Sequence, residues 1–548
     1  MLFVFTHVAH TMHSIFVQYL FLILIILALN LIADKLRLAY PIVLVVGGLA
    51  LSFTTQFSSI SIHPELVFFI FLPPLLYEAA WQISWKEFWK WRRLIATFAF
   101  LIVIITACVI ALASRALIPG FTLALGFLLG GIISPPDAIS ATTIMRRVNV
   151  PRAMVSIAEG ESLLNDASSL IVFRFALAAI ITGQFYLQEA AISFVLVILG
   201  GISVGVVLGI VFFQIHRRLQ MTASIEIVLT LVTPYCLYYV AEYLHFSGVL
   251  AVVSGGLFLS SRRQRLLSFE SRIKGVNVWT NLVFVLNGLI FLLIGLQLPA
   301  VVQQLGDISL PRAIFYALVI SVVLIVTRLL CTLGASAFTR FASNFITVAD
   351  ANPGWRNPLI LGWSGMRGVV SLAAALSIPL VINEGQPFPY RNLILFITFT
   401  VILVTLVFQG LTLPWVIRMV KVEDKYTMIS DREQEILIQK KAVETSLQLL
   451  DEKYASERAE NEHLDNLFTR LEMDLRSLDH GLKVDDPKGN SLARYQTVYL
   501  EVLERQRALL DEMNQSADFD EELIRKYLSL IDMEEFKLRE EQLTNGES

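Results

Sequence analysis

The chain has 548 residues, of which 55% are hydrophobic and only 16% are charged, and its mean hydropathy is +0.66. This composition excludes an ordinary water-soluble protein. Repeated apolar runs of roughly 20 residues, the length that crosses ~30 Å of hydrocarbon, predict an all-α polytopic membrane protein. The net charge of −3 hides a division, because residues 421–548 carry 31 acidic and 18 basic residues while the remainder is basic. We therefore predict a transmembrane domain at residues 1–420 and an acidic tail at residues 421–548.

Hydropathy predicts about thirteen spans in the transmembrane domain. We expect the first to be a retained helix and not a signal peptide, because no A-x-A-like cleavage site follows it. The predicted spans are residues 14–33, 39–56, 64–82, 94–114, 121–145, 153–182, 189–214, 222–242, 246–261, 277–298, 311–339, 357–382 and 391–419.

The connections between these spans alternate in their content of Lys and Arg. One alternate set holds eighteen such residues, and the other holds only Arg115, Arg312 and Arg391. The positive-inside rule assigns the basic set to the cytoplasm. We therefore expect the N-terminus outside the cell and the acidic tail in the cytoplasm.

Two predicted spans are interrupted by residues that break helices. The fifth carries SPPDA (134–138) and the twelfth carries GWSGMRG (362–368). Proline removes a backbone donor, and irregular backbone at membrane depth is tolerated only where it lines a cavity or is buried in protein. The two breaks lie seven spans apart and in opposite orientations, which indicates inverted repeats with two broken helices at a transport site.

The sixth span carries EGESLLNDASS (159–169), a run of polar residues inside an apolar segment. A charged side chain at bilayer depth costs at least ~2.5–3.5 kcal/mol on insertion scales, so such residues usually face a cavity. Helical spacing places Glu159, Ser162, Asp166 and Ser169 on one stripe. Glu161 and Asn165 lie on the adjoining stripe. We interpret this polar face as half of an ion site.

Asp137 in the first break and Asp166 in the sixth span form the central candidate pair. Removal from water disfavours the charged form of a carboxylate, so a proton and a metal cation become rivals for the same oxygens. Hard cations prefer oxygen ligands, which the two aspartates, the Ser162 hydroxyl and the Pro136 carbonyl could supply. The structural alternative is that the two acids are hydrogen-bonding links between helices.

Four further charged residues lie inside the predicted spans. Glu78 follows a Pro-Pro kink, and it is either a third acid on the access path or an interfacial residue beside two tryptophans. Arg367 in the second break needs a counter-charge, for which Glu161 is the candidate. Arg174 and Arg328 offset acids that the sequence does not identify.

The acidic tail is predicted to be helical. Leucines from Leu464 to Leu482 follow a heptad-like spacing, and amphipathic stretches follow at about 491–514 and 519–541, the last with Asp518 as a candidate N-cap. The tail either pairs with its copy in a dimer or folds back as a helical hairpin.

The chain carries no Walker A, HExxH or GxSxG motif, so we expect neither ATP-driven pumping nor an enzyme, and no cofactor. The three cysteines, Cys108, Cys236 and Cys331, lie inside predicted spans and are expected to be small buried hydrophobes. We expect no nucleic-acid partner.

Five segments resemble the bacterial NhaP-type and NHE-type sodium/proton exchangers. They are GESLLNDA (160–167), the SPPDA break, the segment 229–257 beginning LTLVTPY, FVLNGLIFLLIGLQL (284–298) and GMRGVVSLAAAL (365–376). The resemblance implies an NhaA-like fold of thirteen helices with inverted repeats, in a homodimer of the bacterial inner membrane. It also implies one-for-one electroneutral exchange of Na⁺, K⁺ or Li⁺ for H⁺ by a moving core domain, in the service of pH homeostasis.

The resemblance also implies roles for individual residues. Asp166 and Asp137 would bind the cation, with help from Ser162, the carbonyl of Pro136 and the carboxylate of Glu78. Glu161, Arg367 and Asn165 would form a structural cluster. The chain departs from many relatives in having Pro136 where they place Thr or Val, which removes a hydroxyl ligand and bears on ion selectivity.

We therefore expect a secondary antiporter of Na⁺ and H⁺, or of K⁺ and H⁺, in contact with lipid. Two other classes remain open from the residues alone. A cation channel would use the same acids as a selectivity ring, and a membrane sensor would signal through the tail. Exchange measured as the loss of a pH gradient on addition of a cation separates the three.

Overall fold

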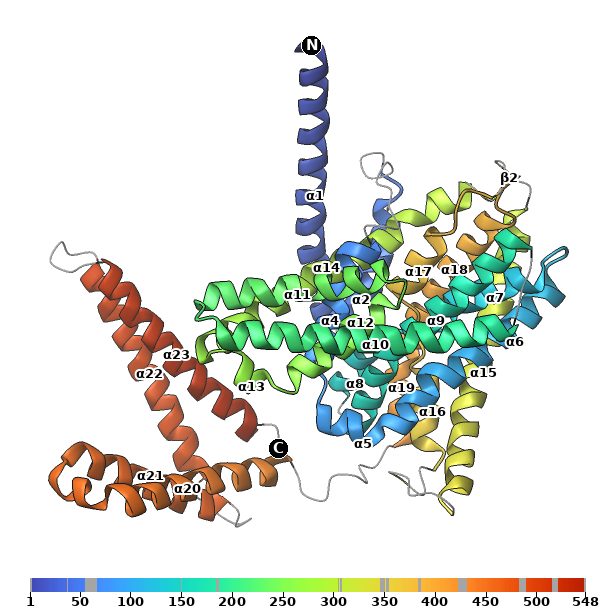
Figure 1. Ribbon diagram of the computed structural model, residues 1–548. Helices are drawn as coiled ribbons and strands as arrows, with labels where there is room; N and C mark the ends of the chain where they lie inside the picture. The colour runs from blue at the N-terminus through green and yellow to red at the C-terminus, as the bar shows by residue number, and fades with distance from the viewer. Residues whose placement is uncertain are drawn as a thin grey trace. The chain divides into compact units, whose positions relative to one another are not determined.

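The computed structural model describes residues 2–36, 38–54, 67–148, 150–183, 187–303, 305, 308–344, 350, 354–382, 386–421, 431–481, 489–514 and 521–546 (Figure 1). It divides the chain into two compact units, Met1–Glu423 and Asp424–Ser548. Both units are built almost entirely from helices.

The first half of the larger unit contains α1 (Leu2–Leu36), α2 (Tyr40–Leu51), π-helical η1 (Val67–Phe71), α4 (Leu72–Gln82), α5 (Trp85–Ala96), π-helical η2 (Thr97–Ile102), α6 (Val103–Leu117), α7 (Leu123–Ile133), α8 (Ala138–Arg147), α9 (Arg152–Thr182) and α10 (Leu187–Arg218). The second half contains α11 (Ala223–Tyr243), α12 (Gly248–Ser260), α13 (Arg263–Leu266), α14 (Phe269–Gln303), α15 (Leu310–Ala342), α16 (Arg356–Trp363), α17 (Val369–Leu376), α18 (Arg391–Val404), π-helical η3 (Thr405–Gln409) and α19 (Gly410–Val420). A short antiparallel ladder joins β1 (Val381–Ile382) to β2 (Gln386–Pro387).

Eight helical segments among the described residues are long and apolar enough to cross a bilayer, and the shorter apolar helices α2 and α12 accompany them. The prediction of an all-α polytopic membrane fold is confirmed, while the number of thirteen spans stays a prediction. The eight segments are Trp85–Leu117, Leu123–Arg147, Arg152–Thr182, Ile192–Arg218, Ala223–Tyr243, Phe269–Gln303, Leu310–Phe341 and Arg391–Val420.

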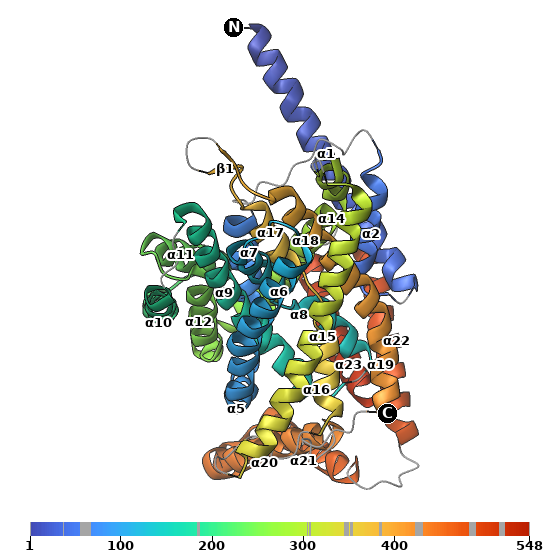
Figure 2. The same cartoon turned by 90° about the vertical axis from the view of Figure 1, so that its right-hand side faces the viewer.

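The helices of the larger unit pack into two groups. In one, α2 packs along α14, and α12 packs against α4, α10 and α11. Helices α10, α11 and α12 are green in Figure 1. In the other, α7 packs between α6 and α9, while α15 packs against α6, α16 and α18. Figure 2 shows α7, α17 and α18 gathered together, and these three helices are in mutual contact. The groups meet where α9 contacts α4 and α12, and where α14 contacts α17 and α18.

Local sequence explains where several of these helices begin and end. The Thr122 hydroxyl accepts a hydrogen bond from the Leu125 amide at the start of α7, and the Ser247 hydroxyl accepts one from the Leu250 amide at the start of α12. Both are N-caps, which satisfy a backbone donor that the first turn leaves without a partner. Gly183 ends α9 with a φ of 70°, a left-handed conformation that glycine adopts without a steric penalty.

Both interrupted spans are broken at the predicted residues. Helix α7 ends at Ile133 and α8 begins at Ala138, while α16 ends at Trp363 and α17 begins at Val369. The breaks are in direct contact, because the backbone amide of Asp137 donates to the carbonyl of Met366 at 2.7 Å. Each break therefore supplies a backbone hydrogen-bond partner to the other, which satisfies polar groups that the interrupted helices leave free.

The smaller unit contains α20 (Asp431–Glu460), α21 (Glu462–Gly481), α22 (Gly489–Asn514) and α23 (Glu521–Gly546). Helix α20 packs on α21 and α22 packs on α23, the second pair around Leu503, Ile531 and Leu538. The described tail thus contains folded-back helix pairs, as one of the two alternatives predicts. Leu482 and the candidate N-cap Asp518 lie outside the described residues.

Candidate ion-binding site

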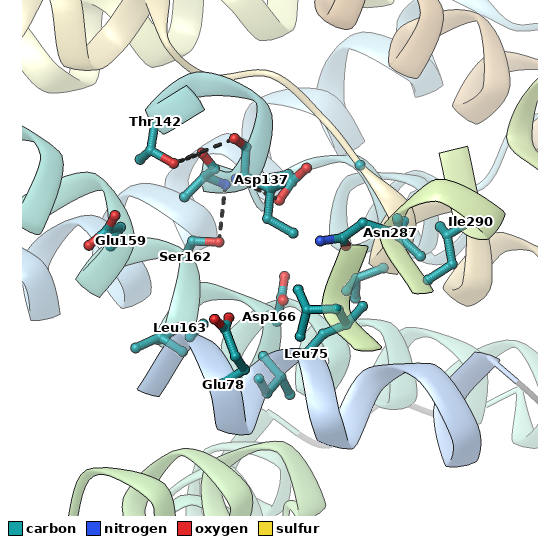
Figure 3. Close-up of a pocket in the computed structure, with 18 of the residues that line it drawn as sticks. Leu75, Glu78, Asp137, Thr142, Glu159, Ser162, Leu163, Asp166, Asn287 and Ile290 are labelled. Carbon is teal, nitrogen blue, oxygen red and sulfur yellow. Dashed lines mark hydrogen bonds between the residues drawn. The ribbon is translucent and has the colours of Figure 1, made fainter. Parts of the chain in front are cut away.

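A cavity of about 380 Å³ lies beside the contact between the two breaks. Its walls include α4, α8, α9, α14 and α17 (Figure 3). All five predicted ion-binding residues line it, namely Glu78, Pro136, Asp137, Ser162 and Asp166. The structure therefore gathers into one space residues that the sequence separates by as many as 88 positions.

Asp137 is both the N-cap of α8 and a wall of the cavity. Its Oδ1 accepts a hydrogen bond from the Ile139 amide at 3.2 Å, which fixes the carboxylate at the positive end of the helix. Its Oδ2 is buried and has no hydrogen-bond partner among the described residues. Gly368 lies directly against this oxygen, since a Cβ added there would stand 2.5 Å from it.

Asp166 lines the same cavity from α9, and the residue is only 8% exposed. Figure 3 shows its carboxylate between Asp137 and Glu78. One turn earlier, the Ser162 hydroxyl accepts a hydrogen bond from the Ala138 amide at 3.2 Å. Ser162 thus holds the start of α8 against α9 and fixes the two aspartates relative to each other.

Asn165 joins the first break, although we expected it in a cluster with Glu161 and Arg367. Its Nδ2 donates to the carbonyl of Pro136 at 2.9 Å. A carbonyl oxygen has two lone pairs, so that of Pro136 keeps one for another partner. Asn165 therefore anchors a carbonyl at the cavity wall.

Glu78 lies on the opposite wall, on α4, where its carboxylate accepts a hydrogen bond from Gln82. Glu78 thus lines the cavity, and its role as an acid on the access path stays a prediction. The wall of the cavity also includes an ion pair that sequence reasoning missed, in which Arg146 donates to Glu159 at 2.7 Å. Both side chains are partly exposed, so water reaches this part of the cavity wall.

The expected pairing of Glu161 with Arg367 is wrong, because Glu161 pairs with Arg328. The Nη1 and Nη2 atoms of Arg328 donate to the two carboxylate oxygens of Glu161 at 2.7 and 3.0 Å. Both residues are buried, with exposed fractions of 3% for Arg328 and 1% for Glu161. A fork of two parallel hydrogen bonds is the strongest arrangement of an arginine and a carboxylate, and it occupies both oxygens of Glu161.

Arg367 is also fully buried, and it is held by backbone carbonyls. Its Nε donates to the carbonyl of Ile133 at 2.7 Å and its Nη1 donates to that of Gly365. Ile133 is the last residue of α7, so its carbonyl lies at the negative end of a helix that the break has cut short. The helix end thus supplies the negative charge that we expected from a carboxylate.

The remaining intramembrane cation, Arg174, pairs with Glu242 on α11. Its Nη2 donates to both carboxylate oxygens at 3.0 and 2.8 Å. Neither side chain is fully buried, and the pair links α9 to the group of helices around α12. The sequence offered no partner because Arg174 and Glu242 lie 68 residues apart.

Four carboxylates line the cavity, those of Glu78, Asp137, Glu159 and Asp166, and that of Glu159 is paired with Arg146. No group of three or more His, Cys, Asp or Glu side chains suited to a metal ion occurs within the described ranges. A cation between Asp137 and Asp166 would therefore complete its shell with hydroxyl, carbonyl, amide or water oxygens.

Comparison with known proteins agrees with this geometry. A family described as "Sodium/hydrogen exchanger, transmembrane" matches residues 20–419. The chain belongs to the sodium/hydrogen exchanger family. The resemblance inferred from the sequence motifs is thereby confirmed, and the matched range contains both breaks and every residue that lines the cavity of this exchanger.

Among its relatives, the exchanger is 35% identical over 416 residues to the sodium, potassium, lithium and rubidium/H⁺ antiporter of Bacillus pumilus, an alignment that covers 73% of this chain and 61% of that protein. It thus spans about three fifths of the length of that relative. It is 33% identical over 388 residues to the low-affinity Na⁺/H⁺ antiporter NhaS1 of Synechocystis sp., covering 70% of this chain and 69% of that protein.

The fold is that of a solved structure. The sodium proton antiporter MjNhaP1 from Methanocaldococcus jannaschii superposes with a TM-score of 0.61 at 19% sequence identity, covering 75% of this chain and 100% of that one. At this identity the likeness establishes the architecture alone.

Proposed function

We propose that this exchanger is a secondary active antiporter that moves Na⁺ and H⁺ in opposite directions, with Asp166 and Asp137 as the shared binding site. The observation that carries the proposal is the cavity itself, in which both aspartates, the Ser162 hydroxyl and Glu78 line one space at the contact of two helix breaks. Relatives named for Na⁺, K⁺, Li⁺ and Rb⁺ exchange support a monovalent cation as the cargo.

Exchange follows from competition. A carboxylate in a poorly hydrated cavity is costly as a bare anion, and either a proton or a metal cation relieves that cost. The two cargoes require the same oxygens, so loading one displaces the other. Alternating exposure of the cavity to the two sides of the membrane would then couple the two flows.

The buried charges support a one-for-one stoichiometry. The charged groups around the two breaks are the guanidinium groups of Arg328 and Arg367 and the carboxylates of Glu161, Asp137 and Asp166. With Glu78 on the access path counted apart, these groups leave one negative charge in excess. One Na⁺ or one H⁺ neutralises that excess equally well. Asn165 is uncharged where an aspartate would add a second titratable group, so the loaded core would cross the membrane with the same charge in both directions.

The remaining features complete the proposal. The distribution of Lys and Arg supports an N-terminus outside the bacterial plasma membrane and a cytoplasmic tail. The homodimer and the moving core domain are carried over from the family resemblance, and Glu78 would add a carboxylate on the access path. Glu161, Arg328, Arg367 and Asn165 would hold the site together.

The proposal is tested with purified full-length protein in liposomes that contain a pH-sensitive dye and an acidic interior. We expect addition of Na⁺ outside to raise the internal pH, with K⁺, Li⁺ and Rb⁺ as a series and choline as the inert control. Asp166→Asn should abolish the signal. An imposed membrane potential should change the rate by less than about twofold, whereas a channel would follow the voltage. Full exchange by the Asp166→Asn variant would overturn the site assignment.

A further inference from the structure

Helix α14 forms the wall of the cavity opposite α8 and α9, and it contains a polar residue, Asn287, that the proposed function does not use. Helix α14 contributes Thr280, Val283, Phe284, Asn287 and Ile290, whose spacing places them on one face of the helix. Asn287 is the one amide on this otherwise mostly apolar face. Figure 3 shows its amide group pointing across the cavity toward the space between Asp137 and Asp166, with the nitrogen nearer to that space. A half-turn about χ2 exchanges the two ends of the amide and presents the oxygen instead.

The amide of Asn287 is only partly satisfied by protein. The residue is 4% exposed, and its side chain hydrogen-bonds that of Tyr40 at the start of α2. Its Oδ1 is buried and has no hydrogen-bond partner within the described part of the chain. A buried acceptor left without a partner is destabilising, so a residue kept for packing alone would be better replaced by leucine.

An amide oxygen suits both loaded states of the site. It is a neutral, hard ligand of the kind that alkali cations accept, and it accepts a hydrogen bond from a protonated carboxyl group equally well. Because it adds no charge, it leaves the excess of one negative charge around the breaks unchanged. Asp137 Oδ2 is likewise without a partner among the described residues, so two residues that line the cavity from different sides each have an oxygen without a hydrogen bond.

We propose that Asn287 is a cation-positioning residue whose amide oxygen joins the coordination shell of the cation held by Asp137 and Asp166. The inference rests on the proposed function, and it adds a ligand from α14 on the wall that faces the two aspartates. It makes α14 a determinant of which alkali cation is accepted, because an oxygen on a fixed wall sets how closely the cation can be enclosed.

The test compares variants of the full-length protein in the liposome assay. Asn287→Leu, which preserves the size of the side chain and removes the oxygen, should raise the KM for Na⁺ about tenfold with a maximal rate within about twofold, as expected for the loss of one polar contact. Asn287→Gln, which keeps a neutral amide oxygen on this wall, should hold the KM within about threefold of the parent value. The ratio of KM values for Na⁺ and K⁺ should change only in the leucine variant.

Gln297→Leu is the matched control, since Gln297 is a second buried amide on α14 and is absent from the described residues that line the cavity. Its KM should equal that of the parent. If Asn287→Leu fails to fold, Asn287→Ala gives the same readout without filling the space. An unchanged KM in a folded, active Asn287 variant overturns the inference, as does an equal rise in Gln297→Leu. Absence of exchange in the parent protein itself would instead refute the proposed function.

Discussion

Asp137 and Met366 meet at the centre of the exchanger, where the amide of Asp137 donates to the carbonyl of Met366 at 2.7 Å. This bond joins two helix breaks that lie more than 200 residues apart in the chain. On one side of it, Asp137 caps α8 and faces the cavity. On the other, Arg367 holds the end of α7. The two breaks are therefore joined directly, and together they carry Asp137, one of the two proposed ion-binding acids, and the buried cation Arg367.

Gly368 should be intolerant of any side chain. A Cβ there would lie 2.5 Å from Oδ2 and 2.8 Å from Cβ of Asp137, so Gly368→Ala must turn the Asp137 carboxylate or part the two breaks. Overpacking of this kind costs about 1–3 kcal/mol. We expect the KM for Na⁺ to rise at least about fivefold in the liposome assay. Gly334→Ala is the control, because a Cβ at that position in α15 meets no atom within 4 Å. Wild-type kinetics in Gly368→Ala would show that Asp137 does not need its observed position.

Arg328 should contribute to stability through its pair with Glu161. Removing one partner of a buried ion pair costs about 3–5 kcal/mol, because the other charge stays buried without compensation. We expect Arg328→Ala to lower the thermal midpoint of the detergent-solubilised protein strongly. Replacing both partners by hydrophobic residues, as in Glu161→Leu with Arg328→Met, should recover much of that loss. A double variant as unstable as the single one would contradict the assigned pairing.

Arg367 should affect folding more than ion affinity. Its contacts run to the carbonyls of Ile133 and Gly365 and not to the cavity acids, so Arg367→Ala leaves the end of α7 without its cation. We expect a reduced yield of folded protein and, in the fraction that folds, a KM for Na⁺ within about threefold of the parent value. Fluorescence-detected size exclusion gives the yield and the liposome assay gives the KM. A normal yield with a greatly raised KM would place Arg367 in the ion site instead.

The tail should lose stability in acid through Glu535. Hydrogen bonds from Arg507 and then from Arg539 lower the pKa of Glu535 below its usual value of 4.5. Because the pKa of Glu535 is lower in the folded state, its ionised carboxylate stabilises the α22–α23 pair at pH values above 4.5. This stabilisation is lost as the pH falls through the folded pKa. We expect protection factors from amide hydrogen exchange in α22 and α23 to fall below about pH 4.5. Glu535→Gln should show a smaller dependence on pH, and equal profiles would contradict the assignment.

The sequence predicts the parts of the site that leave a local signal. Asp166 and Glu161 stand out because a charge in an apolar span is costly, and SPPDA and GWSGMRG stand out because proline and glycine disrupt helices. The ion pairs between distant helices leave no such local signal in the sequence. Nothing near Glu161 distinguishes Arg328, 167 residues away, from Arg367, and only the packing of α15 against its neighbours decides between them.

Asn287 shows a second limit. One asparagine in the apolar run FVLNGLIFL has no feature that separates a link between helices from a residue of the ion site. Its meaning comes from the direction of the side chain and from an oxygen without a partner, which are properties of the folded chain. The pair of Arg146 and Glu159 was missed for the same reason, because the two residues lie on different helices and only the fold brings them together.

Competition between Na⁺ and H⁺ for Asp166 and Asp137 is the central claim, and the KM for Na⁺ measured across a range of pH tests it most directly. If both cargoes require the same oxygens, the KM should rise about tenfold for each unit by which the pH falls on the acidic side, while the maximal rate reached at saturating Na⁺ stays constant. A KM independent of pH, with only the maximal rate falling in acid, would show that proton and cation occupy separate sites and would contradict the account.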